Sequence, residues 1–307
     1  MTAVKGLSLL SGGLDSQLAV KVLESAGAEV EGVCFATPFF SPSAAEKAAE
    51  ALGIRLHIVD FTATELALIE NPPHGFGKAM NPCIDCHAGM IRCAGEMAAR
   101  LGFDFVATGE VLGQRPMSQN RQALGIVERE AALQGRLVRP LSALLLEPSI
   151  PEREGRIDRS KLLSLQGRRR DAQIALAAQF GITEYPSPAG GCKLTEAAYG
   201  RKLKDLRDHE GLGSRRLVEL LAVGRHFRLP DGTGLIVGRD QRENEILACE
   251  TALGDFFDSG NLPGPGALLV GGAHSADDLA LARRIVAAYT KGGGEASRDF
   301  MQPYHIC

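Results

Sequence analysis

The stretch Ser11-Gly12-Gly13-Leu14-Asp15-Ser16 decides the fold of the N-terminal part of this 307-residue chain. It follows the short apolar run 7–10, which predicts a buried parallel strand, and precedes residues 17–25, whose apolar spacing predicts a helix. A strand, a Gly-Gly turn and a helix N-terminus together form an anion site, because glycine lets backbone N–H groups approach phosphate oxygens closely. We expect Asp15 to orient the hydroxyl groups or to hold Mg²⁺. The expected phosphate-binding residues are Ser11, Gly12, Gly13, Asp15 and Ser16.

Strand and helix patterns alternate along the rest of this region. The predicted strands are residues 29–36, 55–60, 103–108 and 137–141, and the predicted helices are residues 43–52, with Ser43 as the expected N-cap, 88–101 and 171–180. Strands joined by helices form a parallel sheet with both faces covered. We therefore expect an α/β fold with a doubly wound, mostly parallel sheet and a ligand beyond the carboxyl ends of its strands.

Two further segments end at that edge of the predicted sheet. Cys34 lies near the end of strand 29–36, where it is either a contact for the base of a bound nucleotide or a plain buried strand residue. Gly109 and Glu110 follow strand 103–108 directly. We expect Gly109 beside the phosphate-binding turn, and Glu110 either orienting the nucleotide or its Mg²⁺ or standing as a solvated loop carboxylate.

Three cysteines form a second candidate site. Cys83 and Cys86 are spaced Cys-x-x-Cys, so a short turn can place both sulfurs on one side. Cys192 follows a Gly-Gly pair, which lets its backbone approach a bulky group closely. The spacing alone is compatible with metal or cluster ligation, with a redox dithiol, or with chance. A structural zinc site that adds His87 to the three cysteines is the main inorganic alternative.

Composition restricts the class of protein. Apolar residues make up 45% of the chain, and no leader-like N-terminal segment is present. We expect a cytoplasmic protein with no membrane partner, whose cysteines are thiols or metal ligands. The net charge of −3 gives no global attraction to nucleic acid, so RNA binding has to come from local basic patches.

The pattern changes after Gly211. Residues 225–229 and 234–238 flank Pro-Asp-Gly-Thr, which predicts a β-hairpin, and residues 275–289 predict a helix capped by Ser275. We expect two domains, a catalytic domain over residues 1–210 that carries the cysteine site and a smaller α+β domain over residues 211–307.

The motifs of the first two hundred residues resemble a known family. Ser-Gly-Gly-Leu-Asp-Ser is similar to the signature of the PP-loop ATP pyrophosphatases, of the adenine nucleotide α-hydrolase type. Together with Asn81-Pro82-Cys83-x-x-Cys86 and the Cys192 segment, it looks like the PP-loop tRNA thiolation enzymes. The Asn-Pro-x-x-x-Cys core is similar to the tRNA 2-thiouridylases, and Gly109-Glu110-x-Leu-Gly-Gln is similar to the 4-thiouridine synthetases. The resemblance implies ATP and Mg²⁺ as cofactors and adenylation of a tRNA uridine carbonyl, whose oxygen is then replaced by sulfur.

The resemblance also implies roles for individual residues. A subset of the family holds a [4Fe–4S] cluster with three cysteines, which match Cys83, Cys86 and Cys192 here. Asp15, Glu110 and Cys192 are the expected catalytic residues. The chain shows no rhodanese-like tail and no recognisable N-terminal RNA-binding extension. The sulfur donor is therefore expected to be free sulfide or a cysteine desulfurase.

Several alternatives stay open at this point. A cluster-free thiouridylase would carry a persulfide on Cys192 and resolve it with Cys86. Another PP-loop adenylating enzyme acting on RNA, or an RNA-binding module with a degenerate ATP site, would not need all three cysteines. The modified tRNA position, the choice between 2-thiouridine and 4-thiouridine, and the oligomeric state are not predicted.

The C-terminal residues resemble the RNA-binding domain of NFACT proteins. The resemblance rests on Arg225-x-Phe227 through Gly232, on Val237-Gly238-Arg239-Asp240, and on the helix up to Tyr289. It implies tRNA contacts in this domain, although a surface arginine on a hairpin is by default simply solvated. The candidate phosphate contacts are Arg225, Arg228, Arg239 and Arg242.

Overall fold

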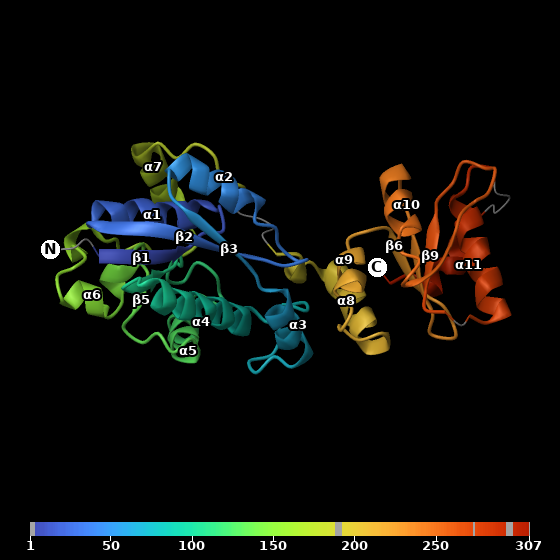
Figure 1. Cartoon of the computed structure of the whole chain (residues 1–307), viewed down its shortest axis with the longest axis horizontal. Coiled ribbons are helices and arrows are strands. Elements are labelled where there is room, and N and C mark those ends of the chain that lie inside the picture. Colours follow the sequence, from blue (N-terminus) through green and yellow to red (C-terminus); the bar gives the residue numbers. More distant parts are fainter. Residues whose placement is uncertain (1–3, 188–191, 273, 293–296, 307) are drawn as a thin grey trace. The chain divides into compact units, whose positions relative to one another are not determined.

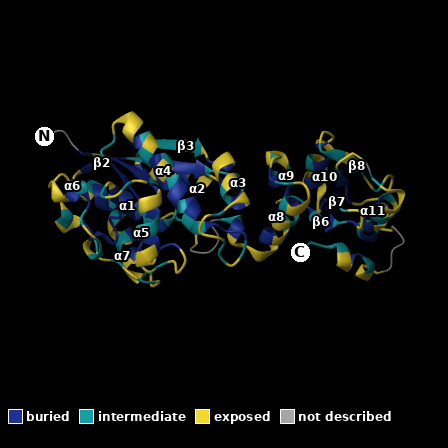
Figure 2. Cartoon of the chain, turned by 90° about the horizontal axis from the view of Figure 1, so that it is seen from below, coloured by how far each residue is buried: buried dark blue, intermediate teal, exposed yellow. Residues whose placement is uncertain are grey.

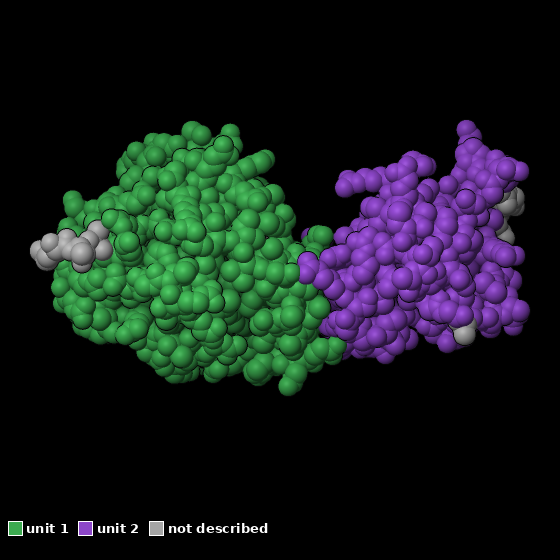
Figure 3. Space-filling model, viewed as in Figure 1, with its two compact units in different colours: residues 1–77, 81–193 green, residues 78–80, 194–307 purple. Residues whose placement is uncertain are grey.

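A computed structural model describes residues 4–187, 192–272, 274–292 and 297–306. The chain divides into two compact units, one made of Met1–Gly77 with Asn81–Lys193 and one made of Lys78–Met80 with Leu194–Cys307 (Figure 3). The boundary between Glu210 and Gly211 that the sequence predicts lies inside the second unit. The Gly190–Gly191 pair before Cys192 lies outside the described residues.

The first unit is built on a five-stranded sheet with the order β3-β2-β1-β4-β5 (Figure 1). Each neighbouring pair of strands is parallel. The order reverses at β1, so this strand is the switch point where ligands bind in such sheets. The predicted doubly wound α/β fold is therefore confirmed. The strands are β1 (Val4–Leu9), β2 (Ala28–Ala36), β3 (Leu56–Asp60), β4 (Phe105–Ala107) and β5 (Leu137–Val138).

Helices cover both faces of this sheet (Figure 1). One face packs apolar residues of α1, α2 and α7 into one core, and the other packs residues of α3, α4 and α5 into a second core. The strands β1, β2, β4 and β5 are mostly buried, whereas the edge strand β3 is intermediate to exposed and the outward sides of the helices are exposed (Figure 2). The helices are α1 (Leu14–Ser25), α2 (Ser43–Leu52), α3 (Thr62–Glu70), α4 (Cys83–Leu101), α5 (Arg121–Glu130), α6 (Ile150–Arg153) and α7 (Asp171–Phe180).

Three details differ from the sequence-based expectation. Helix α4 begins at Cys83, so the Cys-x-x-Cys pair opens this helix and does not lie in the preceding loop. Helix α3 was not predicted, because its apolar residues are spread around the helix and do not form one apolar face. Ser43 is the first helical residue of α2 and not its cap, since Pro42 occupies the N-cap position.

The second unit contains a four-stranded antiparallel sheet with the order β6-β7-β9-β8. The predicted hairpin is confirmed by the pairing of β6 with β7, and the predicted cap of α11 by the Ser275 hydroxyl, which accepts the Asp278 N–H at 3.1 Å. The elements are α8 (Ala197–His209), α9 (Arg215–Leu220), β6 (Arg225–Arg228), β7 (Gly234–Val237), α10 (Gln241–Ala248), β8 (Gly254–Phe257), β9 (Ala267–Val270) and α11 (Ala276–Tyr289). In the part of the chain that is described, no helix has the length and apolar character needed to cross a membrane.

Candidate active site

The turn between β1 and α1 depends on its glycines. Gly12 has a φ of +78°, and a Cβ on it would lie 2.3 Å from the carbonyl carbon and oxygen of Ala44 at the start of α2. Gly13 is the N-cap of α1, with extended backbone angles. Only glycine therefore allows this turn to lie against the first turn of α2 while it opens the N-terminus of α1 toward a ligand.

The Asp15 carboxylate accepts a hydrogen bond on only one of its two oxygens among the described residues. Gln114 Nε2 donates a hydrogen bond to Asp15 Oδ2 at 2.7 Å, and Gln173 Nε2 donates to Gln114 Oε1 at 3.3 Å. Asp15 Oδ1 is buried and has no hydrogen-bond partner among the described residues. A buried carboxylate oxygen without a partner is costly, and a cation or a donor on a bound ligand would remove that cost.

The two serines of the turn bond locally. Ser16 Oγ donates to the Gly13 carbonyl at 2.8 Å, and Ser11 Oγ lies 3.4 Å from both Ser16 Oγ and the Gly13 nitrogen. Ser11 is exposed, whereas Ser16 is buried. The hydroxyl groups and the first N–H groups of α1 thus share one small region at the end of β1.

Gly109 closes this region from the neighbouring strand. Since β1 and β4 are parallel partners, the residues after them emerge side by side. A Cβ on Gly109 would lie 2.6 Å from the Asp15 carbonyl carbon and 2.7 Å from the Ser16 nitrogen. Gly109 therefore lies against the Asp15–Ser16 peptide, as the order of the strands predicts.

Glu110 is the centre of a buried ion-pair cluster. Its carboxylate accepts hydrogen bonds from Arg139 Nε at 2.9 Å and from Thr108 Oγ1 at 3.0 Å, and it lies 3.2 Å from His87 Nδ1. Burial raises the pKa of Glu110, but the Arg139 guanidinium and His87 outweigh it and hold the pKa at about 2. Arg139 also bonds Glu128 and the Leu124 carbonyl. Glu110 is thus an ionised anchor for the helix that carries Cys86, and not a solvated loop carboxylate.

Cys86 lies beside a carboxylate that the sequence did not single out. Its thiol donates to Glu65 Oε2, with 3.0 Å between the sulfur and the oxygen, and Glu65 is fully buried on α3. Burial raises the pKa of the Cys86 thiol well above its usual range, and Glu65, Cys192 and Cys83 raise it further. Burial likewise raises the pKa of Glu65, more than its hydrogen bond to Cys86 lowers it. Glu65 could not be singled out from the sequence, because it is an isolated acid in an apolar helix and no motif surrounds it.

The three predicted cysteines lie in one neighbourhood of the first unit. Cys83 and Cys192 are both near enough to Cys86 for their charges to act on its thiol. The Asn81 amide donates to the Cys83 sulfur at 3.1 Å, and Lys193, next to Cys192, donates its N–H to the Phe39 carbonyl just beyond β2. Phe39 is 1% exposed, so the Cys192 segment is attached to the same edge of the sheet as the Gly-Gly turn.

No group of three or more His, Cys, Asp or Glu side chains within the described ranges is arranged to hold a single metal ion. The structural zinc site with His87 is therefore not supported, and His87 faces Glu110. A cubane cluster separates its thiolate ligands more widely than one tetrahedral zinc ion does, and its ligands are cysteines. The donor types at Cys83, Cys86 and Cys192 are thus compatible with an iron–sulfur cluster.

Cys34 has a different environment. It is 6% exposed and packs in the core with residues of α1 and α2, and its S–H group lies 3.6 Å from the Phe35 carbonyl oxygen. Burial, followed by the charge of Glu46, raises the pKa of Cys34 to about 11. The structure therefore places Cys34 as a buried strand residue, the alternative that the sequence left open.

Two of the four arginines expected to contact RNA are engaged within the second unit. Arg228 forms ion pairs with Asp205 and Glu210, and Arg239 pairs with Glu243. Arg225 instead donates to the Gly238 carbonyl at 3.1 Å and lies over the ring of Tyr289. Arg242 is exposed. Arg239 and Arg242 are the exposed members of the four, Arg225 and Arg228 are half-buried, and among the described residues Arg225 and Arg242 form no ion pair.

Comparison with known proteins supports both halves of this description. Residues 1–144 match the family described as thiamine biosynthesis protein (ThiI), and residues 224–301 match the NFACT protein RNA binding domain. A tRNA-specific 2-thiouridylase MnmA of Sulfurimonas denitrificans is 35% identical over 115 residues, which cover 34% of this chain and 33% of that protein. A probable tRNA sulfurtransferase of Caldanaerobacter subterraneus subsp. tengcongensis is 34% identical over 138 residues, 42% of this chain and 35% of that protein.

The chain thus spans about a third of the length of the curated relatives that it matches. A crystal structure of a 4-thiouridine synthetase–RNA complex with bound ATP is 25% identical and covers 57% of this chain and 50% of that chain, with a TM-score of 0.39. That score is too low to establish a common overall structure. The two family matches nevertheless agree with the resemblance read from the motifs: residues 1–144 are similar to the ThiI family, and residues 224–301 are similar to the NFACT RNA-binding domain.

Proposed function

We propose that this protein is an ATP-dependent tRNA sulfurtransferase, which activates a uridine carbonyl with ATP and replaces its oxygen with sulfur to form 4-thiouridine or 2-thiouridine. One observation carries the proposal. The Gly-Gly turn and the three cysteines are linked by two contacts, Gly109 against the Asp15–Ser16 peptide and Glu110 against His87, the residue after Cys86. The names of the relatives, a tRNA sulfurtransferase and a 2-thiouridylase, support the same chemistry.

The Gly-Gly turn supplies the nucleotide site in this proposal. Backbone N–H groups at Gly12, Gly13 and the start of α1 hold the phosphates of ATP, helped by the hydroxyl groups of Ser11 and Ser16. The unpartnered Asp15 Oδ1 receives Mg²⁺, which lowers the cost of the charge that develops at the α-phosphate. Gln114 fixes the other oxygen of this carboxylate.

The first chemical step is adenylation. The uridine is turned out of its stack, and its carbonyl oxygen attacks the α-phosphate of ATP. The oxygen–phosphorus bond forms while the bond to the β-phosphate breaks, so pyrophosphate leaves and AMP is joined to the base. The carbonyl oxygen thereby becomes part of a good leaving group.

The three cysteines support the second step. Cys83, Cys86 and Cys192 would hold the [4Fe–4S] cluster, which, with only three protein ligands, offers an iron for a sulfide ligand. Hydrosulfide, supplied as free sulfide or released from a cysteine desulfurase persulfide by a thiol reductant, attacks the activated carbon, and AMP leaves with the former carbonyl oxygen. The buried Glu110–His87 pair keeps the start of α4 beside the nucleotide turn during both steps. Since tRNA is the substrate, we expect the protein in the cytoplasm.

The test is an anaerobic reaction of the full chain with ATP, sulfide and unmodified tRNA, followed by nucleoside mass spectrometry. Thiouridine should form only when ATP is present. Asp15→Asn and Ser16→Ala should each reduce its formation by about 10²-fold or more, the size of effect seen when one transition-state donor is removed. Ser25→Ala, at the far end of α1, is the matched control and should keep the wild-type yield. Absence of thiouridine from the wild-type reaction would refute the proposal.

A further inference from the structure

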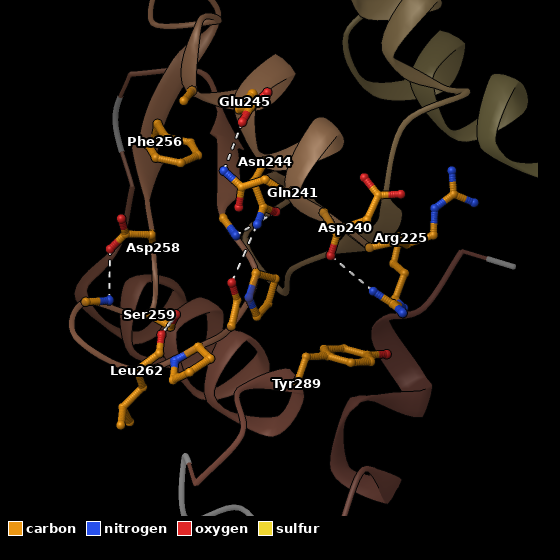
Figure 4. Close-up of a pocket in the computed structure, with 18 of the residues that line it drawn as sticks. Arg225, Asp240, Gln241, Asn244, Glu245, Phe256, Asp258, Ser259, Leu262 and Tyr289 are labelled. Atoms are coloured by element: carbon orange, nitrogen blue, oxygen red, sulfur yellow. Dashed lines mark hydrogen bonds between the residues drawn. The ribbon is translucent and has the colours of Figure 1, made fainter.

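A cavity of about 710 Å³ lies in the second unit beside α10 and the end of α11 (Figure 4). Its size is within the range of sites that enclose one small ligand. The lining combines aromatic and apolar side chains with charged groups, among them Phe256, Leu262, Tyr289, Arg225, Arg298 and Asp258. Nothing in the proposed thiolation chemistry uses this cavity.

One end of the cavity is cationic. The guanidinium carbons of Arg225 and Arg298 each lie 4.4 Å from the centre of the Tyr289 ring. Arg225 donates to the Gly238 carbonyl and Arg298 to the Ala288 carbonyl. Within the described ranges, neither guanidinium has a carboxylate at ion-pair distance, unlike Arg228 of the same unit. The two arginines therefore keep donors for an anionic group and are oriented by the ring that both of them contact.

The other side of the cavity offers hydrogen-bond acceptors next to apolar surface. In Figure 4, Asp258, Ser259 and Leu262 lie across the cavity from Arg225 and Tyr289, and Phe256 lies above them. Asp258 Oδ1 accepts the Gly260 N–H at 2.9 Å, so this carboxylate is fixed in the loop after β8. A ligand that spans the cavity thus meets positive charge at one end and an aromatic ring and a carboxylate at the other.

We propose that this cavity holds one unpaired nucleotide of the RNA substrate, with its phosphate on Arg225 and Arg298 and its base against Phe256. The inference rests on the proposed function for its RNA partner. A nucleotide joins an anion to a flat ring, which matches the two ends of the cavity, and aromatic stacking is how single-stranded bases are held. A paired base cannot turn its ring into a cavity, so duplex RNA does not fit.

The carboxylate of Asp258 adds a preference among bases. It accepts hydrogen bonds only, so it favours a base with an exocyclic amino group, as adenine, cytosine and guanine have, over uracil, whose one donor on the base edge is its ring N3–H. We therefore expect the nucleotide held here to be a different one from the uridine that is modified. The cavity fixes a second point of the RNA.

Binding of short RNAs to the full chain tests this inference without any thiolation. Single-stranded oligomers of adenosine, cytidine or uridine and an RNA duplex of equal charge are titrated by fluorescence anisotropy, at several salt concentrations. The variants are Arg225→Gln, Arg298→Gln and Asp258→Asn. Arg283→Gln is the control, because Arg283 is exposed on α11 and does not line the cavity. Circular dichroism checks that each variant is folded.

Oligo(A) and oligo(C) should bind more tightly than oligo(U) and the duplex. Arg225→Gln and Arg298→Gln should each weaken that binding about tenfold and reduce the salt slope by about 0.7, while Arg283→Gln changes neither. Asp258→Asn should reduce the difference in affinity between oligo(U) and the other two oligomers. Equal binding by the Arg225 and Arg283 variants would overturn the inference. Failure of thiolation by a wild-type chain that binds RNA in this way would count against the proposed function alone.

Discussion

The Cys86 thiol donates a hydrogen bond to the buried Glu65 carboxylate, with 3.0 Å between Sγ and Oε2. Glu65 Oε1 has no hydrogen-bond partner among the described residues, so this acid is not satisfied by its surroundings. The pair joins α3 to the first turn of α4 at the point where the three cysteines lie near one another. Glu65 therefore adds to the raised pKa of the Cys86 thiol, which in the proposed function has to lose its proton to bind the cluster.

Glu65→Gln should shift iron incorporation to lower pH. Burial and then the Glu65 carboxylate raise the pKa of Cys86, so a neutral amide removes one cause and lets the thiolate form at lower pH. Iron content after anaerobic reconstitution between pH 6.5 and 9 measures the shift. Glu96→Gln is the control, because Glu96 raises the pKa of Cys93 instead. An unchanged pH midpoint in Glu65→Gln would show that Cys86 is not a ligand.

Cys83→Ser, Cys86→Ser and Cys192→Ser should each lose most of the bound iron, against about four irons per chain in the reconstituted wild type. Cys93→Ser is the matched control. Cys93 lies on the same helix as Cys83 and Cys86, further from its N-terminus, and should keep the full iron content. Iron and acid-labile sulfide are counted in the same samples. Full iron in Cys192→Ser would remove Cys192 from the ligand set.

Gly109→Ala should weaken ATP binding by about tenfold or more. The added Cβ would lie 2.6 Å from the Asp15 carbonyl, so the nucleotide turn has to move to relieve the clash. Gly125→Ala is the control, since its Cβ meets only the end of the Arg129 side chain at 3.8 Å. Equilibrium dialysis with radiolabelled ATP compares the two. Wild-type affinity in Gly109→Ala would place the nucleotide elsewhere.

The second unit should lose stability in mild acid through His226. Burial, followed by the charge of Lys202, lowers the pKa of this histidine to about 3. In the unfolded chain this histidine takes up a proton near pH 6.5, and in the folded chain it does not. The free energy of unfolding is therefore unaffected by His226 above about pH 6.5 and falls by roughly 1.4 kcal/mol per pH unit below it. Denaturant unfolding followed between pH 7.5 and 5 should show this slope, and His226→Gln should flatten it. A slope that persists in His226→Gln would assign the effect to another group.

The parts of the site that depend on local sequence could be predicted. The turn at Gly12 and Gly13 could be predicted because a Gly-Gly pair stands between a strand pattern and a helix pattern. The approach of Gly109 to this turn follows from the parallel pairing of β1 with β4. That Cys83, Cys86 and Cys192 form one ligand set was expected from the resemblance and stays a prediction; in the structure, the charges of Cys83 and Cys192 act on the Cys86 thiol.

The parts that depend on tertiary packing could not be predicted. Glu65 lies on a helix without a clear apolar face, and only packing of α3 against α4 brings it to Cys86. Glu110 was expected near ATP, but a polar residue after a strand does not reveal that Arg139 and His87 surround it. Arg298 was not singled out, because its contact with Tyr289 joins residues on different segments.

Nucleoside mass spectrometry of tRNA treated with iron-free and with iron-loaded protein tests the central claim most directly. Both samples receive ATP and sulfide under anaerobic conditions, and the thiouridine yield is compared. If Cys83, Cys86 and Cys192 act through a cluster, only the iron-loaded protein should form thiouridine. An equal yield from the iron-free protein would contradict the account, because hydrosulfide would then replace the activated oxygen without any cluster.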